Sequence, residues 1–280
     1  MISVTIPTRN SARTIARCLE SVRRQVTDDE VELLVIDGDS TDDTVGIALN
    51  AGARVISHPG ALLGARRRGF LESRGAVIVL LDSDQVLRPN ALQRACDAIS
   101  DGAAMVVLGE RVWSPRTIVD LLSDMDKRLL EFDITAQLDP RRGVFLPRVF
   151  RRDVLAAGFN AIPTSIDDQC IARDHAIIYW ECFKANDSVR FLPDCVWHIE
   201  PAGVASLWRK EYRWGWSTRE LVSTGMYSDL IRDKTRRREI NRRAPVRLRL
   251  ASLGFLSLKA PAYFAGYFLG HHTFVSSKTS

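Results

Sequence analysis

The run from Ala76 to Asp84 constrains the fold of this chain more than any other stretch. Six consecutive apolar residues, Ala76–Leu81, lead without a break into Asp82-Ser83-Asp84. An apolar run that does not alternate is typical of a strand buried on both faces of a parallel α/β sheet. Acids that follow such a strand lie at the carboxyl edge of the sheet, where open α/β folds bind ligands. Because two like charges repel unless a cation joins them, the pair predicts a divalent metal that holds a phosphorylated ligand.

Strand and helix patterns alternate through the first half of the chain and loosen after Val112. The expected strands there cover Ile2–Ile6, Val31–Ile36, Arg54–Ser57, Ala76–Leu81 and Met105–Leu108, and the expected helices cover Ser11–Gln25, a segment capped at Ser40 or Thr41, Leu62–Ser73 and Pro89–Ile99. In the second half we expect helices over Val119–Phe132, Arg152–Ala157 and Ile166–His175, and strands over Val144–Phe150, Val189–Leu192 and Cys195–Ile199. The pattern predicts an α/β fold, a three-layer, Rossmann-like, mostly parallel sheet followed by a helical C-terminal extension.

The composition of the chain indicates its domain number, the state of its cysteines and its location. The 280 residues suffice for one large domain, or for one domain with an appendage. Five widely spread cysteines without a CxxC pair favour reduced thiols over disulfides or a zinc site. The N-terminus shows no secretory pattern, and no stretch has the roughly 18–20 apolar residues of a spanning helix. We therefore expect a cytoplasmic protein, either free or peripheral at the cytoplasmic face of a membrane.

The basic character of the chain belongs to its C-terminal part. Residues 207–260 hold 14 basic and 5 acidic side chains, so the remainder of this chain of net charge +5 is acidic. Such a segment suits an anionic membrane surface or a polyphosphate ligand, and less often nucleic acid. We expect no nucleic-acid partner.

The usual glycine-rich phosphate-binding loops are missing from the sequence. Neither GxxxxGK[ST] nor GxGxxG occurs. A diphosphate would then have to be neutralised by a metal, and Asp82-Ser83-Asp84 is the available site for it. Mg²⁺ or Mn²⁺ typically takes one or two protein carboxylates and completes its shell with phosphate and water oxygens.

Several segments, in order, resemble the motifs of family 2 glycosyltransferases. They are Val4–Asn10, Cys18–Val22 with Gln25, Val35–Asp42, Gly64–Arg66 with Gly69, Leu81–Asp84, Asp167-Asp168, and Trp197-His198 followed by Arg209–Gly215. The resemblance spans residues 2–220. Two positions depart from the family pattern: the second-strand loop reads Asp37-Gly38-Asp39-Ser40 instead of Asp-Asp-Gly-Ser, and Arg67 replaces the usual Asn after Arg66.

The resemblance implies a GT-A fold, a nucleotide-sugar donor, a divalent metal and inversion at the anomeric carbon. It implies a catalytic domain over residues 1–200, with a nucleotide-sugar half to about residue 112 and an acceptor half over 113–200. Residues 201–280 would form the basic and apolar extension. Because the processive synthases of this family carry several spanning helices, we expect a non-processive enzyme. A UDP-sugar is the expected donor, as the commonest in the family, with a GDP- or dTDP-sugar as the alternative. A hydroxyl, free or lipid-linked, is the expected acceptor.

The resemblance also gives roles to individual residues at the metal and at the reacting hydroxyl. Asp84 is the expected main metal ligand, and His198 a third ligand through a neutral imidazole nitrogen. Asp82 would hold the ribose, a metal-bound water or the metal itself. Since the attacking hydroxyl needs a base on the opposite face, Asp168 is the expected catalytic base and Asp167 the second choice.

The remaining expected contacts are to the nucleotide-sugar. Asp37 would contact the base or ribose, and Arg66 the nucleotide or its phosphate. Arg213 and Trp214 would close over the diphosphate and the donor sugar. The residues that complete the expected nucleotide-sugar site are Pro7, Thr8, Arg9 and Ser83.

Two other functions stay open at this point. A sugar-1-phosphate nucleotidyltransferase also combines a parallel sheet with aspartate-bound metal, but Pro7–Asn10 lacks the glycine-rich loop that such an enzyme places after its first strand. A non-enzymatic protein that binds a membrane surface or nucleic acid would show a steep salt dependence and no metal requirement. The apolar tail Leu248–Leu269 is either a helix packed on the catalytic domain or an interfacial helix on an anionic membrane.

Overall fold

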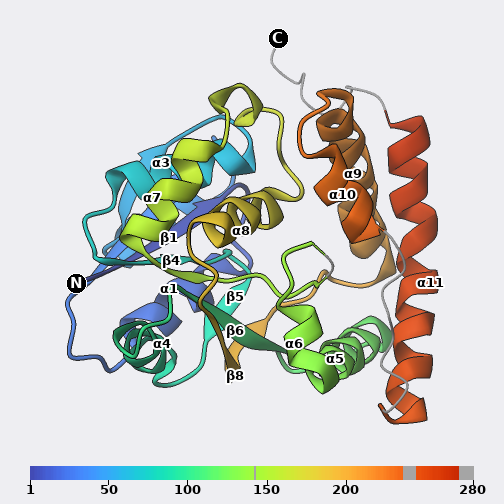
Figure 1. Ribbon diagram of the computed structural model, residues 1–280, viewed down its shortest axis with the longest axis horizontal. Helices are drawn as coiled ribbons and strands as arrows, with labels where there is room; N and C mark the ends of the chain where they lie inside the picture. Colours follow the sequence, from blue (N-terminus) through green and yellow to red (C-terminus); the bar gives the residue numbers. More distant parts are fainter. Residues whose placement is uncertain (142, 236–243, 271–280) are drawn as a thin grey trace.

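A single mixed sheet organises the molecule. The computed structural model describes residues 1–141, 143–235 and 244–270. Within them the sheet has eight strands in the order β3-β2-β1-β4-β7-β6-β8-β5 (Figure 1). The strands are β1 (Ile2–Thr8), β2 (Val31–Asp37), β3 (Arg54–Ser57), β4 (Val77–Leu80), β5 (Gln85–Leu87), β6 (Met105–Val112), β7 (Val149–Arg151) and β8 (Val189–His198). β1 pairs in parallel with β2 and β4, and β6 with β8, whereas β7 and β5 run antiparallel to their neighbours.

Helices cover both faces of this sheet. The α-helices are α1 (Ile15–Arg23), α2 (Thr44–Asn50), α3 (Leu62–Glu72), α4 (Ala91–Ser100), α5 (Ile118–Leu130), α6 (Ile134–Gln137), α7 (Arg152–Ala161), α8 (Asp174–Ala185), α9 (Val204–Ser223), α10 (Ser228–Thr235) and α11 (Val246–Leu269). One core joins α1, α2 and α4 to the sheet, and a second joins α3, α7 and α8 to the opposite face. The expected three-layer α/β architecture is confirmed, because non-alternating strands such as β1 are buried on both sides.

The extension formed by α9, α10 and α11 packs beside this sandwich. In Figure 1, α9 lies between the sheet and α11, which forms one edge of the molecule. Gly215 of α9 and Gly266 of α11 let the two helices approach closely, because a Cβ on either would collide with the carbonyl oxygen of Tyr263 or Tyr212. Leu221 at the end of α9 belongs to the second core of the sandwich, so α9 is not packed apart from it. The domain boundary expected near residue 200 stays a prediction.

Three local expectations were wrong, and the first is the strand expected over Val144–Phe150, of which only Val149 and Phe150 lie in a strand, β7. No helix runs over Ile166–His175: a short 3-10 turn ends at Ile166, and α8 begins only after Arg173, whose φ of 71° is left-handed. The intervening loop is instead tied to α3, where the amide of Gly64 donates to the carbonyl of Asp167. The two strands expected around Pro193 are one irregular strand, β8, and the three-residue β5 was not anticipated. In the part of the chain that is described, none of the helices is both long and apolar enough to cross a membrane.

Candidate active site

The acidic tripeptide lies at the carboxyl edge of the sheet, as expected. Asp82 follows β4, and the neighbouring parallel strands end beside it at Thr8 and Asp37, which are paired in register. β5 begins directly after the tripeptide and pairs Gln85 with His198 at the end of β8. This short strand brings two distant parts of the sequence to one point, because it joins the tripeptide to the last residue of β8.

Asp84 and His198 form the open side of the tripeptide. Oδ2 of Asp84 lies 3.5 Å from Nε2 of His198, and the Asp84 side chain is one-third exposed. The other ring nitrogen of His198, Nδ1, lies 3.2 Å from Oε1 of Glu200. A carboxylate at this position favours the tautomer with its proton on Nδ1, which leaves the Nε2 lone pair facing Asp84.

Asp82 lies on the closed side and is held by two arginines. Its Oδ1 lies 2.5 Å from Nη2 of Arg66, and its Oδ2 lies 2.8 Å from Nη1 of Arg148. Arg66 is almost completely buried in α3 and also pairs with Asp174 at 2.5 Å. Burial alone would raise the pKa of Asp82, but Arg148 and Arg66 outweigh it and hold that pKa well below its usual range. Asp82 therefore stays charged and pairs with both arginines, and its expected contact with a ribose or a metal stays a prediction.

The pairing of Asp82 with two arginines sets it apart from the other two expected metal ligands, Asp84 and His198. No group of three metal-binding side chains is gathered within residues 1–141, 143–235 and 244–270. Asp84 and His198 are brought together, whereas the carboxylate of Asp82 is occupied by the guanidinium groups of Arg66 and Arg148. Two protein ligands are enough for Mg²⁺ or Mn²⁺ when a substrate supplies phosphate oxygens, so the pair fits such an ion.

A buried ionic network joins the two sides behind the tripeptide. Arg148 lies 3.6 Å from Glu110, and Lys127 of α5 lies 3.0 Å from Glu110 and 3.6 Å from Glu200. Ser123 of α5 donates a 2.6 Å hydrogen bond to Glu200. Burial would raise the pKa of Glu110, but Lys127 and Arg148 lower it from 4.5 to about 2. The pKa of Glu200 is also lowered, because the effect of burial is outweighed by His198, Lys127 and Ser123.

The network carries an excess of negative charge. Its three cations, Arg66, Arg148 and Lys127, face five carboxylates, those of Asp82, Asp84, Glu110, Asp174 and Glu200. Histidines apart, two negative charges remain uncompensated. Of the five carboxylates, that of Asp84 has no arginine or lysine within ion-pair distance among the described residues. A divalent cation beside Asp84 would balance this charge, since close like charges are stabilised by a shared cation.

His175 contacts the closed side from α8. Its Nε2 meets Nη1 of Arg148 and lies 3.8 Å from Oδ1 of Asp82. Burial first, and then Arg148 and Arg66, lower the pKa of His175 from 6.5 to about 4. His175 is therefore neutral at physiological pH, and its ring nitrogen can accept a hydrogen bond from Arg148.

Three arginines lie close enough to repel one another: Arg209 and Arg213 on α9, and Arg9 directly after β1. Burial, followed by repulsion from Arg9 and Arg209, lowers the pKa of Arg213. Within the described residues, none of these three guanidinium groups has an ion-pair partner. Trp214 is exposed and lies under the ammonium of Lys210, 5.2 Å from the ring centre. The arrangement brings together the predicted Arg9 and Arg213 and adds Arg209.

The remaining predicted nucleotide contacts line the same edge. Pro7 and Thr8 end β1, and the buried Thr8 hydroxyl has no hydrogen-bond partner in the described part of the chain. Asp37 is buried at the end of β2, and its carboxylate accepts hydrogen bonds from the amide and hydroxyl of Ser40 at 2.9 and 2.6 Å. Ser83 donates a 3.0 Å hydrogen bond to Ser11. Direct contacts of these residues and of Arg66 with a nucleotide stay predictions.

Asp167 and Asp168 differ sharply in their surroundings. Arg67 holds Asp167 in a two-point pair, with Nε 2.6 Å from Oδ2 and Nη2 3.0 Å from Oδ1. Asp168 is exposed, and no basic side chain of the described residues lies within ion-pair distance of it. Its Oδ1 packs over Gly60, where a Cβ would collide with it. Of the two, Asp168 has the carboxylate that is free to meet a substrate.

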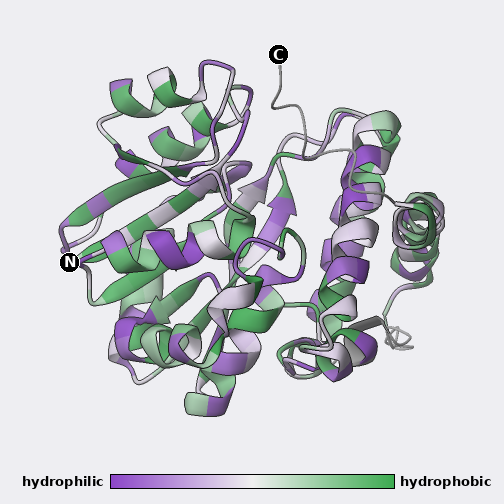
Figure 2. Cartoon of the chain, turned by 90° about the horizontal axis from the view of Figure 1, so that it is seen from above, coloured by the Kyte–Doolittle hydropathy of each residue, from purple (hydrophilic) through white to green (hydrophobic). Residues whose placement is uncertain are grey.

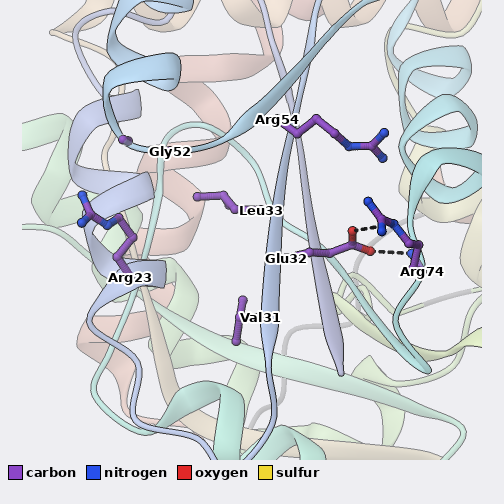
Figure 3. Close-up of a pocket in the computed structure, with 8 residues that line it drawn as sticks. Arg23, Val31, Glu32, Leu33, Gly52, Arg54 and Arg74 are labelled. Carbon is purple, nitrogen blue, oxygen red and sulfur yellow. Dashed lines mark hydrogen bonds and ion pairs between the residues drawn. The ribbon is translucent and has the colours of Figure 1, made fainter.

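A separate hollow lies at the opposite end of the sheet. It has a volume of about 490 Å³ and is lined by the first residues of β2 and β3, including Glu32 and Arg54 (Figure 3). The Arg74 side chain lies 3.7 Å from Glu32, and Arg54 pairs with Glu72 at 3.0 Å. None of the residues that line the hollow is among the predicted site residues, so the hollow is not the predicted site.

The sequence-based analysis missed the residues that build the network. These are Glu110, Lys127, Arg148, Asp174, His175 and Glu200. Only Glu200 had a local signal, because it follows the singled-out His198 by two residues. Arg148 and Lys127 come from the stretch after Val112 in which no motif was found, and nothing in the sequence places them beside Asp82.

Family comparison agrees with this geometry. Residues 3–153, more than half of the chain, match the family described as Glycosyl transferase family 2. The chain belongs to this family. An uncharacterized protein of Mycobacterium tuberculosis, MT1568, is 35% identical over 116 residues, which cover 40% of this chain and 36% of that protein. A PGL/p-HBAD biosynthesis glycosyltransferase of Mycobacterium bovis is 38% identical over 94 residues, which cover 31% of this chain and 36% of that protein.

Solved structures share the fold of this family member over most of its length. S. aureus TarS 1–349 in complex with UDP-GlcNAc superposes with a TM-score of 0.56 at 15% identity, covering 94% of this chain and 81% of that one. Glucosyl-3-phosphoglycerate synthase from Mycobacterium tuberculosis, in complex with Mn²⁺, UDP and glucosyl-3-phosphoglycerate, gives 0.51 at 22% identity, covering 80% and 79%. At these identities the likeness shows the GT-A fold alone. The matches to the curated relatives span about a third of their length.

Proposed function

We propose that this protein is a metal-dependent, inverting glycosyltransferase that moves a sugar from a nucleotide-sugar to an acceptor hydroxyl. The observation that carries the proposal is the pair formed by Asp84 and His198, two metal-binding side chains 3.5 Å apart at the carboxyl edge of a family 2 sheet. The excess negative charge of the network behind them supports a divalent cation at this point. Family membership counts against the nucleotidyltransferase and nucleic-acid-binding alternatives.

Each part of the site has a task in such a transfer. Asp84 and His198 would hold Mg²⁺ or Mn²⁺, which when bound offsets the charge that develops on the leaving diphosphate. Arg9 and Arg213 would bind the same diphosphate, because no acid of the described residues neutralises them. Asp168 would accept the proton of the attacking hydroxyl, since its carboxylate is exposed.

The finer assignments rest on the bound ligands and the names of similar proteins. Structures of similar fold contain UDP-GlcNAc, or UDP with Mn²⁺, which supports a UDP-sugar and Mn²⁺ here. The relatives named for PGL/p-HBAD biosynthesis are compatible with a lipid-linked acceptor. The cytoplasmic location expected from the free cysteines belongs to the same proposal.

A ligand-binding screen tests the proposal directly. The protein would be heated with UDP-, GDP- and dTDP-sugars, with and without Mn²⁺, and slow hydrolysis of each donor would be followed. We expect one donor class to raise the melting temperature only when Mn²⁺ is present. Asp84→Ala should abolish that shift while changing the stability of the free protein by less than about 0.5 kcal/mol. If no donor raises the melting temperature of the folded protein or is hydrolysed by it, the proposed activity is excluded.

The two neighbouring acids provide a matched test of the base. Asp168→Asn should keep Mn²⁺-dependent donor binding and lose transfer, because the amide cannot accept the proton. Asp167→Asn should instead lower stability, since it breaks the two-point pair with Arg67. Transfer at the parental rate by Asp168→Asn would show that another group is the base.

A further inference from the structure

The outer face of α11 is an uncharged, mostly apolar stripe along the whole helix. Seven exposed positions recur at the helical period and lie within one narrow arc; they are Val246, Leu250, Leu253, Ser257, Pro261, Phe264 and Phe268. Arg247, Gly254 and Leu269 are exposed beside this arc. The large side chains of the stripe are 49–68% exposed. At 1.5 Å per residue the stripe is about 33 Å long. Figure 2 shows α11 nearly end-on, at the edge of the molecule farthest from the sheet.

The inner face of α11 is already used in packing. Phe255 joins Val119 of α5 and Leu207 of α9 in one apolar cluster, and Leu248 joins Leu129 of α5 in another. Ser252 donates a 2.6 Å hydrogen bond to the buried Asp126 of α5. The helix is therefore fixed on the protein by one side, as the packed-helix alternative for the tail expected, and the membrane alternative concerns only its outer face.

An aromatic side chain extends the stripe onto α9. Trp208 is 45% exposed, and its indole nitrogen donates a 2.9 Å hydrogen bond to the carbonyl of Leu258 in α11. A half-exposed indole with its polar atom satisfied is suited to a boundary between water and an apolar phase.

The chain that enters α11 is strongly basic. Residues 232–249 contain nine basic and two acidic side chains, and Arg247 at the start of the helix is exposed. Exposed apolar patches of this extent usually mark an interaction site. A second copy of the chain carries the same excess of basic residues and so offers no charge complementarity to them. An anionic surface would instead be attracted to them.

We propose that α11 docks the protein on an anionic lipid surface. The apolar stripe would enter the boundary between headgroups and acyl chains, with the helix lying flat because its inner face holds α5 and α9. The basic side chains in the sequence before α11 would add electrostatic attraction to the headgroups. This surface is built independently of Asp84 and Asp168, and its loss would leave donor binding intact.

Vesicle sedimentation of the full chain tests this docking. We expect binding to vesicles of phosphatidylcholine with phosphatidylglycerol, weak binding to phosphatidylcholine alone, and release from the anionic vesicles by salt. The double variant Leu250→Glu with Phe264→Glu should lower the partition coefficient about 100-fold, because two apolar anchors are lost and two negative charges gained. Both positions are exposed, so the melting temperature should stay unchanged.

A matched control places the same substitution elsewhere on the surface. Leu49 of α2 and Leu71 of α3 are 57% and 67% exposed, so Leu49→Glu with Leu71→Glu adds the same charge away from α11. This variant should bind the anionic vesicles as the parent does. The proposal is overturned if the parent ignores the vesicles, if both variants bind alike, or if the parent is a dimer that only the α11 variant dissociates while neither binds lipid.

Discussion

Asp82 and Asp84 stand one residue apart, yet they belong to two different environments. Asp82 is enclosed by Arg66 and Arg148, and its charge is balanced inside the protein. Among the described residues, only the imidazole of His198 lies within ion-pair distance of the Asp84 carboxylate, which belongs to a network with uncompensated negative charge. The difference shows that an acidic motif does not define a metal site by itself: the charges packed against each carboxylate decide whether it supports the fold or remains available to a ligand.

The largest expected effect tests whether the closed side is structural. Arg66→Met leaves Asp82 and Asp174 without their shared partner and should lower the free energy of unfolding by about 3–5 kcal/mol. Arg68→Met on the same helix breaks only an exposed pair with Glu72 and should cost less than about 1 kcal/mol. Urea denaturation measures both. Equal losses of unfolding free energy in the two variants would show that the buried pairs of Arg66 matter no more to stability than a surface pair.

Lowering the pH should lower the free energy of unfolding through the protonation of His175, which lies on the closed side. Unfolded histidine binds a proton near pH 6.5, whereas His175 in the folded protein does so only near pH 4. Between these values the unfolded state holds more protons, so stability falls as the pH is lowered, by at most about 3 kcal/mol over the window. His175→Gln keeps an acceptor for Arg148 and should flatten this dependence. Parallel curves for parent and variant, measured by urea denaturation at each pH, would contradict the assignment.

The smallest expected effect concerns the open side. Glu200→Gln removes the carboxylate beside Nδ1 of His198 and should weaken Mn²⁺ binding about 10–100-fold, because the imidazole is no longer held in one tautomer. Calorimetric titration with Mn²⁺ measures the change, and the stability loss should be smaller than for Arg66→Met. Glu131→Gln, which breaks a pair with Arg111 outside the site, is the control and should bind Mn²⁺ normally. Equal weakening of Mn²⁺ binding in both variants would show that Glu200 has no specific role in metal binding.

Local sequence patterns predicted the elements that are short-range in origin. The β4 strand, the loop that follows it and most helices of the first half were found within a few residues of where they lie. The stretch from Ile166 to His175 was not, because its backbone bonds go to α3 and to Ser217 of α9 instead of continuing a helix. Such bonds depend on partners that no local pattern reveals.

The sequence by itself determined the α/β class, the place of the acidic tripeptide at a sheet edge and the apolar and basic character of the tail. Those properties follow from residue periodicity and from the order of strands and helices, which are written along the chain. Only the tertiary structure decided which acid is neutralised and which is open. Arg148 comes from a segment far from Asp82, and the energy of a buried charge depends on the groups that surround it in space. The same holds for α11, whose apolar residues became an inner and an outer face only when α5 and α9 covered one side of it.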